Sequence, residues 1–313
     1  MNKKIRLSII FSILFISAHA QDLIKSGPMV GYSTMQEVLL WVQTDEKAKV
    51  HFEYYEIDNP KIRFKTDNKD TDKKSGYVAK LIADQVTPGK KYKYEIFIND
   101  LKVERDYVME FQSQKLWKWR TDPPDVSFVI GSCSYVNEPQ FDRPGKPYGN
   151  NFEIFNSIHS KNPDFMLWLG DNTYLREPDW NSRTGFINRY SHTRALAELQ
   201  PLLASTHHYA TWDDHDFGPN NSDGSFWLKE TASEIFKLFW GNPNYDVTGK
   251  GGITGFFQWG DLDFFLMDNR YHRTSNNNFT EDRQLLGKDQ IDWLINALSF
   301  SQAPFKFIAI GGQ

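Results

Sequence analysis

The stretch Phe165-Met-Leu-Trp-Leu-Gly-Asp-Asn-Thr-Tyr174 decides the fold class of this chain. It begins with a continuous apolar run, which is typical of a strand buried on both faces of a parallel sheet. Polar residues follow at once, from Gly170-Asp171 to Tyr174. In α/β proteins the functional groups lie at this carboxyl end of the strands. The stretch therefore predicts a layered α/β domain. It also predicts that the functional site lies at the carboxyl ends of the strands of its sheet.

The segments on either side of this run alternate between strand and helix patterns. Further strands are predicted at 127–131, 209–212, 255–259, 263–267 and 305–310, and helices at 152–159, 186–203, 226–240 and 290–300. Strands that alternate with helices indicate a layered α/β domain. We place this domain, in which the layers form an α+β sandwich, at residues 126–313.

In the residues before this domain, side chains alternate with the two-residue period of short strands. Runs at 37–42, 50–55, 77–82, 92–99 and 108–111 are rich in strand-forming residues and are separated by turn residues. The segment 86–94 looks like the turn and strand of fibronectin type III domains. We therefore expect an all-β, fibronectin III-like sandwich at residues 21–116. Asp122-Pro-Pro124 can continue neither a strand nor a helix, so residues 117–125 are the predicted linker.

The first 20 residues have the pattern of a secretory signal peptide. A basic start at residues 3–6 precedes an apolar run at 7–16, and Ala18-His-Ala20 is the cleavage motif. The apolar run is too short to span a bilayer. We expect an exported protein, periplasmic or secreted, that keeps no transmembrane segment after removal of residues 1–20.

Composition excludes several classes of protein. The chain has 313 residues, which suggests two domains, and it has no low-complexity tract. A formal net charge of −4 argues against a nucleic-acid-binding protein, which usually has a basic excess. Cys133 is the single cysteine, so no intrachain disulfide can form.

Four polar clusters follow predicted strands. They are Gly131-Ser-Cys133, Gly170-Asp-Asn-Thr-Tyr174, Asp213-Asp-His-Asp216 with Asn220 and Asn221, and Asp268-Asn-Arg270 with Arg273. Three acids beside one histidine at 213–216 repel one another unless a cation or base compensates them. Carboxylate and amide oxygens suit hard cations such as Ca²⁺, Mn²⁺ or Fe³⁺. The clusters therefore predict a metal site, and a phenolate with a thiolate favours a redox-capable or strongly Lewis-acidic ion.

Together these motifs resemble the PhoD-type alkaline phosphatases, a branch of the calcineurin-like metallophosphoesterase superfamily. The matching pieces are Gly-Ser-Cys-Ser (131–134), Leu-Gly-Asp-Asn-Thr-Tyr (169–174), Thr-Trp-Asp-Asp-His-Asp (211–216), Met-Asp-Asn-Arg-Tyr-His-Arg (267–273) and Leu-Gly-Lys-Asp-Gln-Ile-Asp-Trp-Leu (286–294). The resemblance covers most of residues 25–313.

The resemblance implies iron and calcium as cofactors. Cys133 would bind iron through sulfur, and Tyr174 would give Fe³⁺ a phenolate. Asp171 would bridge the metals. Asp214 occupies the place of a metal-binding asparagine of the superfamily, and Asp213 would support it.

The resemblance also implies the groups that act on a phosphate ester. Asn220 or Asn221 would supply an amide oxygen to calcium. His215 would stabilise or protonate the leaving oxygen, and Arg270 would hold the substrate phosphate or order the site. The implied function is an exported phosphoesterase that hydrolyses phosphate monoesters or diesters with metal-activated water.

Two features depart from the family pattern. The twin-arginine export signal that is usual in the family is absent from residues 1–20. The family also has a later Gly-Asp-x-His segment with further metal ligands, and nothing after Asp268 resembles it. We therefore expect a fragment that lacks the C-terminal part of its metallophosphatase domain and is itself inactive.

Two alternatives stay open at the level of sequence. One is an enzyme like the purple acid phosphatases, which also pair a β domain with an iron–tyrosinate site. Cys133 and the absence of Gly-Asn-His-Glu argue for the PhoD-type branch instead. The other is an inactive secreted binding protein whose functional part is the sandwich.

Overall fold

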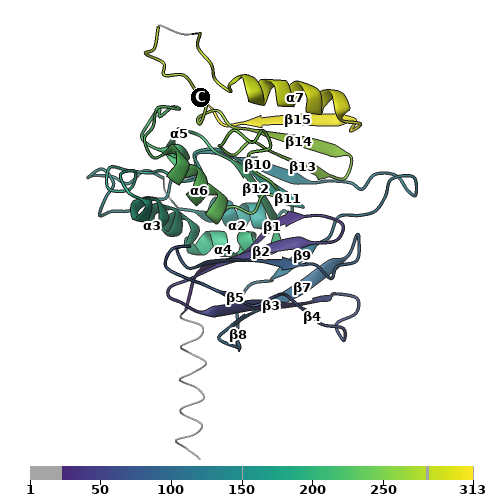
Figure 1. Ribbon diagram of the computed structural model, residues 1–313. Coiled ribbons are helices and arrows are strands. Elements are labelled where there is room, and N and C mark those ends of the chain that lie inside the picture. Colours follow the sequence, from purple (N-terminus) through teal and green to yellow (C-terminus); the bar gives the residue numbers. More distant parts are fainter. Residues whose placement is uncertain (1–22, 150, 280–281, 313) are drawn as a thin grey trace, which may run out of the picture.

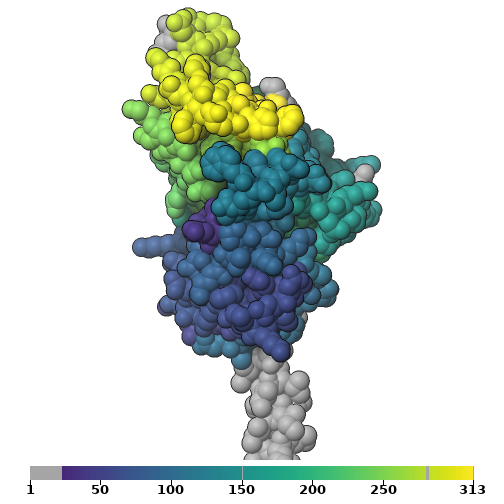
Figure 2. Space-filling model, turned by 90° about the vertical axis from the view of Figure 1, so that its right-hand side faces the viewer, coloured from purple at the N-terminus to yellow at the C-terminus, as the bar shows by residue number. Residues whose placement is uncertain are grey.

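The structure is a computed structural model that describes residues 23–149, 151–279 and 282–312. Two six-stranded sheets and one three-stranded sheet form successive layers, with the helices beside the middle layer and the three-stranded layer (Figure 1). The view turned by 90° shows the N-terminal strands at one end of the molecule and the last strand at the other (Figure 2). The expected signal peptide lies outside the described residues. Among the described helices, none combines the length and the apolar character that crossing a membrane requires.

The N-terminal half is a β-sandwich, as predicted. One layer contains β1 (Ile24–Ser33), β2 (Val38–Thr44) and β6 (Val78–Ala83), and the other is built on β3 (Lys49–Glu56) and β7 (Lys91–Ile98). Short strands β4 (Phe64–Lys65), β5 (Lys69–Asp70), β8 (Leu101–Val103) and β9 (Glu110–Gln112) complete the second layer. Alternate residues of β3 and β7, among them Phe52 and Ile96, are buried between the layers, because successive side chains of a strand point to opposite faces.

The first layer of this sandwich continues into the sheet of the C-terminal half. Strand β1 pairs in parallel with β12 (His207–Thr211), with Val30 opposite His207. The resulting strand order is β10-β11-β12-β1-β2-β6, where β10 is Phe128–Gly131 and β11 is Phe165–Leu169. The N-terminal strands thus extend the same sheet in which β10, β11 and β12 lead, at their carboxyl ends, into the polar clusters.

The C-terminal half is a layered α/β structure, which confirms the predicted fold class. A second sheet of β13 (Gly255–Trp259), β14 (Leu262–Met267) and β15 (Phe305–Ile310) faces β10–β12. Aromatic side chains fill the space between the two sheets, with Phe165 in contact with Phe257 and Phe264. On the other face of the first sheet lie α2 (Glu153–His159), α3 (Arg183–Arg194), α4 (Gln200–Ser205) and α6 (Lys229–Phe239). Helix α7 (Lys288–Phe300) covers the second sheet, where Trp293 packs on Phe265.

One predicted helix differs from the structure. Residues 186–203 form three pieces instead of one helix: the end of α3, a 3₁₀ turn η1 (Ala197–Leu199) and α4. Leu196 has an extended ψ of 126°, and Pro201 lies in the first turn of α4. Proline is tolerated in a first turn but not inside a helix, so a new helix begins here.

Candidate metal centre

Three parallel strands bring the first three polar clusters to one place. Cys133 follows β10, Asp171 follows β11, and Asp213 and Asp214 follow β12. The first two loops are joined by backbone hydrogen bonds, from Cys133 N to Gly170 O (3.2 Å) and from Ser134 N to Asp171 O (2.9 Å). The loops converge because parallel strands end at the same edge of a sheet.

The backbone at this edge is unusual. Cys133 and Asp171 have positive φ angles of 57° and 50°, which few residues other than glycine adopt. Gly170 also has a positive φ, and a Cβ there would lie 2.8 Å from the amide nitrogen of Asp213. Glycine therefore allows the loops after β11 and β12 to touch. Strained backbone of this kind gathers at functional sites.

The close approach brings two carboxylates and an imidazole together. Ligand atoms of Asp171, Asp214 and His215 lie within 4.8 Å of one another. The backbone N–H of His215 donates to Asp171 Oδ1 at 3.3 Å. Burial, together with the nearby charges of Asp214 and Asp213, raises the pKa of Asp171 to about 7. The charged form of the Asp171 carboxyl is therefore unfavourable unless a cation lies close to it.

His215 lies in short helix α5 (Asp214–Phe217). Burial lowers its pKa, which the charge of Asp214 opposes. Its Nδ1 is buried and has no hydrogen-bond partner among the described residues. Neutral imidazole nitrogen is a good metal ligand and also a good proton carrier. The position of His215 is compatible with either role.

Tyr174 and Cys133 flank the triad. Tyr174 lies near Cys133 and Asp171, and its ring centroid lies 4.5 Å from that of His215. Burial and the charge of Asp171 raise the pKa of Tyr174. The structure thus places both predicted iron ligands beside the triad, with Cys133 exposed.

The two predicted asparagines differ in position. Asn220 lines the cavity beside the triad. Asn221 has a positive φ of 61°, and its backbone N–H donates to Asp214 Oδ2. The backbone of Asn221 therefore orients Asp214, whereas Asn220 faces the space where a ligand would bind.

Asp213 and Arg270 form a buried pair. The Nε–H of Arg270 donates to Asp213 Oδ1 at 2.6 Å, and the same oxygen accepts from Asn269 Nδ2 at 2.8 Å. The carboxylate of Asp213 also caps α5 by bonding the backbone of Asp216, whose side chain accepts from the Asp213 N–H at 3.0 Å. Asp213 lies outside the triad and supports the loop that carries Asp214. Arg270 is only 3% exposed, and its Nη2 also lies 3.8 Å from Asp214 Oδ1, so it contacts one carboxylate of the triad as well as Asp213.

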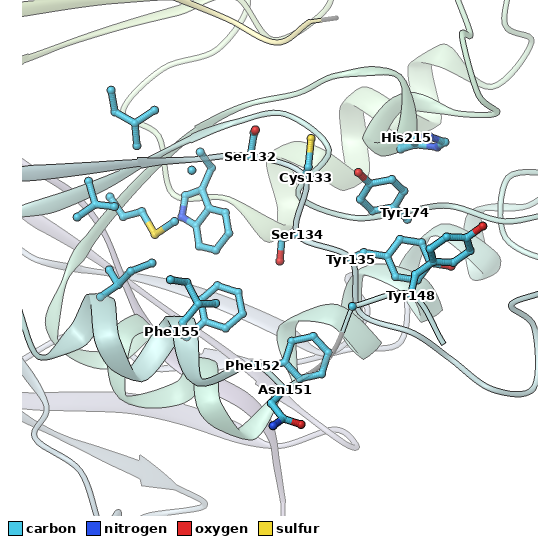
Figure 3. A pocket seen from close by; sticks show the side chains of 18 of the residues that line it. Ser132, Cys133, Ser134, Tyr135, Tyr148, Asn151, Phe152, Phe155, Tyr174 and His215 are labelled. Atoms are coloured by element: carbon cyan, nitrogen blue, oxygen red, sulfur yellow. The ribbon is translucent and has the colours of Figure 1, made fainter. Parts of the chain in front are cut away.

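A cavity of about 910 Å³ opens beside the triad. Figure 3 shows Cys133, Tyr174 and His215 on one side of it and Phe152 and Phe155 on another. A ligand in the cavity therefore meets polar groups near the triad and an apolar wall farther away. Wide, partly apolar pockets with a few convergent polar groups are typical binding sites.

Two charged groups of this cavity, Arg143 and Arg176, were not predicted from the sequence. Arg176 follows Tyr174 by two residues and lines the cavity together with Tyr135. Its Nε–H donates to Asp142 Oδ1 at 3.1 Å. No motif marks Arg176 or Asp142, because they meet only through the folding of the loop before α2.

The donor set suits a metal ion. Asp171 and Asp214 offer carboxylate oxygens, and a ring nitrogen of His215 lies near them. Tyr174 and Asn220 add oxygen donors at the border of the same space. Hard cations prefer oxygen ligands and also accept imidazole, so these residues fit the metals that the family resemblance implies.

Comparison with protein-family models gives two matches. Residues 241–311 match the family described as PhoD-like phosphatase. Residues 21–116 match a family described only as a domain of unknown function, DUF7800. Among curated proteins, no sequence matches the chain.

Solved structures share the fold. The structure of PhoD matches with a TM-score of 0.73 and 18% identity over 92% of this chain, which spans 62% of the PhoD chain. A purple acid phosphatase from yellow lupin (Lupinus luteus) seeds matches with a TM-score of 0.59 and 12% identity, over 91% of this chain and 51% of its own. The chain is therefore similar to the PhoD-like phosphatases, in sequence over residues 241–311 and in fold over nearly its whole described length.

Proposed function

We propose that the chain is the site-bearing part of a metal-dependent phosphoesterase that hydrolyses phosphate monoesters or diesters. One observation carries the proposal: the donor atoms of Asp171, Asp214 and His215 lie within 4.8 Å of one another beside an open cavity. The likeness to PhoD-like phosphatases supports it. This chain spans only 62% of the PhoD chain. The activity that we propose is therefore that of the whole protein to which this chain belongs.

The residues have distinct parts in such a reaction. A metal bound there would supply activated water and polarise the phosphoryl group. Asp171 and Asp214 hold the metal, and Arg270 keeps the loop of Asp214 in place through Asp213. His215 holds a proton at its ring nitrogen and passes it to the leaving oxygen.

We also propose that the metals are iron and calcium. Tyr174 and Cys133 lie together beside Asp171, where a phenolate and a thiolate would bind Fe³⁺. Asn220 offers an oxygen for calcium. Export to the periplasm or the medium is part of the same proposal, and it rests on the pattern of residues 1–20.

The test combines metal analysis with turnover. The whole protein that contains this chain is loaded with iron and calcium and assayed with 4-nitrophenyl phosphate and its bis ester. Asp171→Asn should lose metal and activity, while Asp58→Asn, whose side chain is 81% exposed, should keep both. Tyr174→Phe should weaken or shift a charge-transfer absorption band of the iron form. Equal metal content and turnover in Asp171→Asn and the unchanged chain would contradict the assignment.

A further inference from the structure

Arg176 is a cation at the cavity, and it has no part in the reaction proposed above. Its Cζ lies 5.0 Å from the ring centroid of Tyr135 and 5.5 Å from that of Tyr174. Cation–π contacts of this kind hold a guanidinium in one plane. Since the Tyr174 ring also contacts His215, Arg176 lies next to the triad.

A buried acid anchors the inner edge of this guanidinium. Asp142, whose side chain is 1% exposed, accepts from Arg176 Nε at 3.1 Å and from the Tyr135 hydroxyl at 2.6 Å. The second oxygen of Asp142 accepts from Arg189 at 3.3 Å, and Arg189 is balanced by Asp179 at 2.8 Å. Arg176 is therefore fixed from behind.

Arg176 also lines the cavity. Its side chain is 17% exposed, and its Nε donates to buried Asp142. Because that hydrogen bond uses Nε, the terminal nitrogens are the donors of Arg176 that a ligand in the cavity would use. A planar guanidinium with terminal N–H groups matches the oxygens of a phosphate.

Arg270, the arginine expected from the sequence, is placed differently. Its side chain is 4% exposed, its Nε is bonded to Asp213, and its Nη1 donates to Ser222 O at 3.2 Å. A substrate phosphate would have to displace these bonds to reach Arg270. No such displacement is needed at Arg176.

We propose that Arg176 binds the phosphate group of the substrate, with its terminal N–H groups on the non-bridging oxygens. The proposal rests on the proposed function, because it takes the ligand beside the triad to be a phosphate ester. It makes Arg176 a substrate-binding residue and Arg270 a positioning residue that acts through Asp213.

The experiment measures phosphate affinity separately from turnover. Inorganic phosphate is titrated into the metal-loaded whole protein by calorimetry, and kcat and KM are measured with 4-nitrophenyl phosphate. Arg176→Gln should weaken phosphate binding and raise KM by about 10- to 100-fold, the usual span for a lost charged hydrogen bond. Arg176→Lys keeps the charge without the planar fork, so it should recover part of the affinity.

Arg120→Gln is the matched control, because Arg120 is exposed and lies outside the cavity. It should leave both quantities unchanged. Metal content and the circular-dichroism spectrum show whether each variant is folded, and Arg176→Lys decides the question if Arg176→Gln does not fold. Unchanged phosphate affinity in folded Arg176→Gln, or in Arg176→Lys where Arg176→Gln does not fold, beside normal turnover of the unaltered whole protein, would overturn this proposal alone. An unaltered whole protein without metal binding or turnover would overturn the proposed function as well.

Discussion

At the scale of single residues, the protonation of Asp171 should make the stability of the metal-free protein depend on pH. Its pKa of about 7 lies above the ordinary 3.8, because burial and neighbouring carboxylates disfavour its charge. A raised carboxyl pKa means that the folded state holds the proton more tightly than the unfolded state does. Without metal, the free energy of unfolding should therefore fall as pH rises from about 4 to about 7.

This first prediction is checked by urea unfolding of the chelated protein across that pH range. Asp171→Asn cannot ionise, so its unfolding midpoint should decline less with pH than that of the unaltered chain. Asp58→Asn serves as the exposed control. Identical pH profiles for the two variants would show that Asp171 does not carry the effect.

The second prediction concerns His215 as a proton donor. His215→Ala should reduce kcat by about 10² to 10⁴, the usual contribution of acid–base catalysis. The loss should be smaller for a good leaving group such as nitrophenolate, which needs little protonation. Turnover of aryl and alkyl phosphates and metal content are the measurements. Loss of metal in His215→Ala would instead make the imidazole a ligand, which its place in the triad also allows.

At the scale of elements, the N-terminal strands hold the end of helix α6. Trp41 Nε1 of β2 donates to Leu238 O at 3.0 Å, and the Lys80 ammonium of β6 bonds Lys237 O and Trp240 O. The last carbonyls of a helix have no partner within it, so side chains must satisfy them. Here those side chains come from the other half of the molecule.

The third prediction follows from that contact. Trp41→Phe removes the bond to Leu238 and leaves a small gap in the core, so it should cost about 2 to 4 kcal/mol of unfolding free energy. Trp119→Phe is the matched control, because Trp119 is 89% exposed. Urea unfolding monitored by circular dichroism measures both. An equal midpoint for the two variants would mean that Trp41 does not stabilise the contact.

At the scale of the whole molecule, the two halves share a sheet and a core. Met29, Leu39 and Trp41 belong to the same apolar cluster as Trp168 of β11 and Phe236 of α6. Elements that share a core lose each other's burial when one of them unfolds. The sandwich and the α/β layers should therefore unfold together.

The fourth prediction is a single unfolding transition for the full chain. Tryptophan fluorescence and far-ultraviolet circular dichroism should report the same midpoint. Phe52→Ala, which opens a cavity deep in the sandwich, should shift the whole transition to lower denaturant. Two separate transitions, of which Phe52→Ala moves only one, would show that the halves are independent.

Local sequence patterns were sufficient for most of the elements and for the ends of the strands that carry the site. Strand β11 has the predicted bounds because it is a continuous apolar run between polar residues, and β15 has them because strand-forming residues lie between Pro304 and Gly311; both signals depend only on neighbouring positions. The same reasoning placed Asp171, Asp214 and His215 after parallel strands, where they do meet.

Only the tertiary structure shows which distant strands pair and which distant side chains meet. The pairing of β1 with β12 joins the predicted sandwich to the α/β sheet, and no periodicity encodes which distant strand a strand will meet. The roles proposed for the two arginines have the same cause. Arg270 follows a strand, as a binding residue would, yet it is buried on Asp213, while Arg176 reaches the cavity because Asp142 and two tyrosine rings hold it there. Charge and spacing show that a side chain can bind an anion, but burial and the partners brought by folding decide whether it is free to do so.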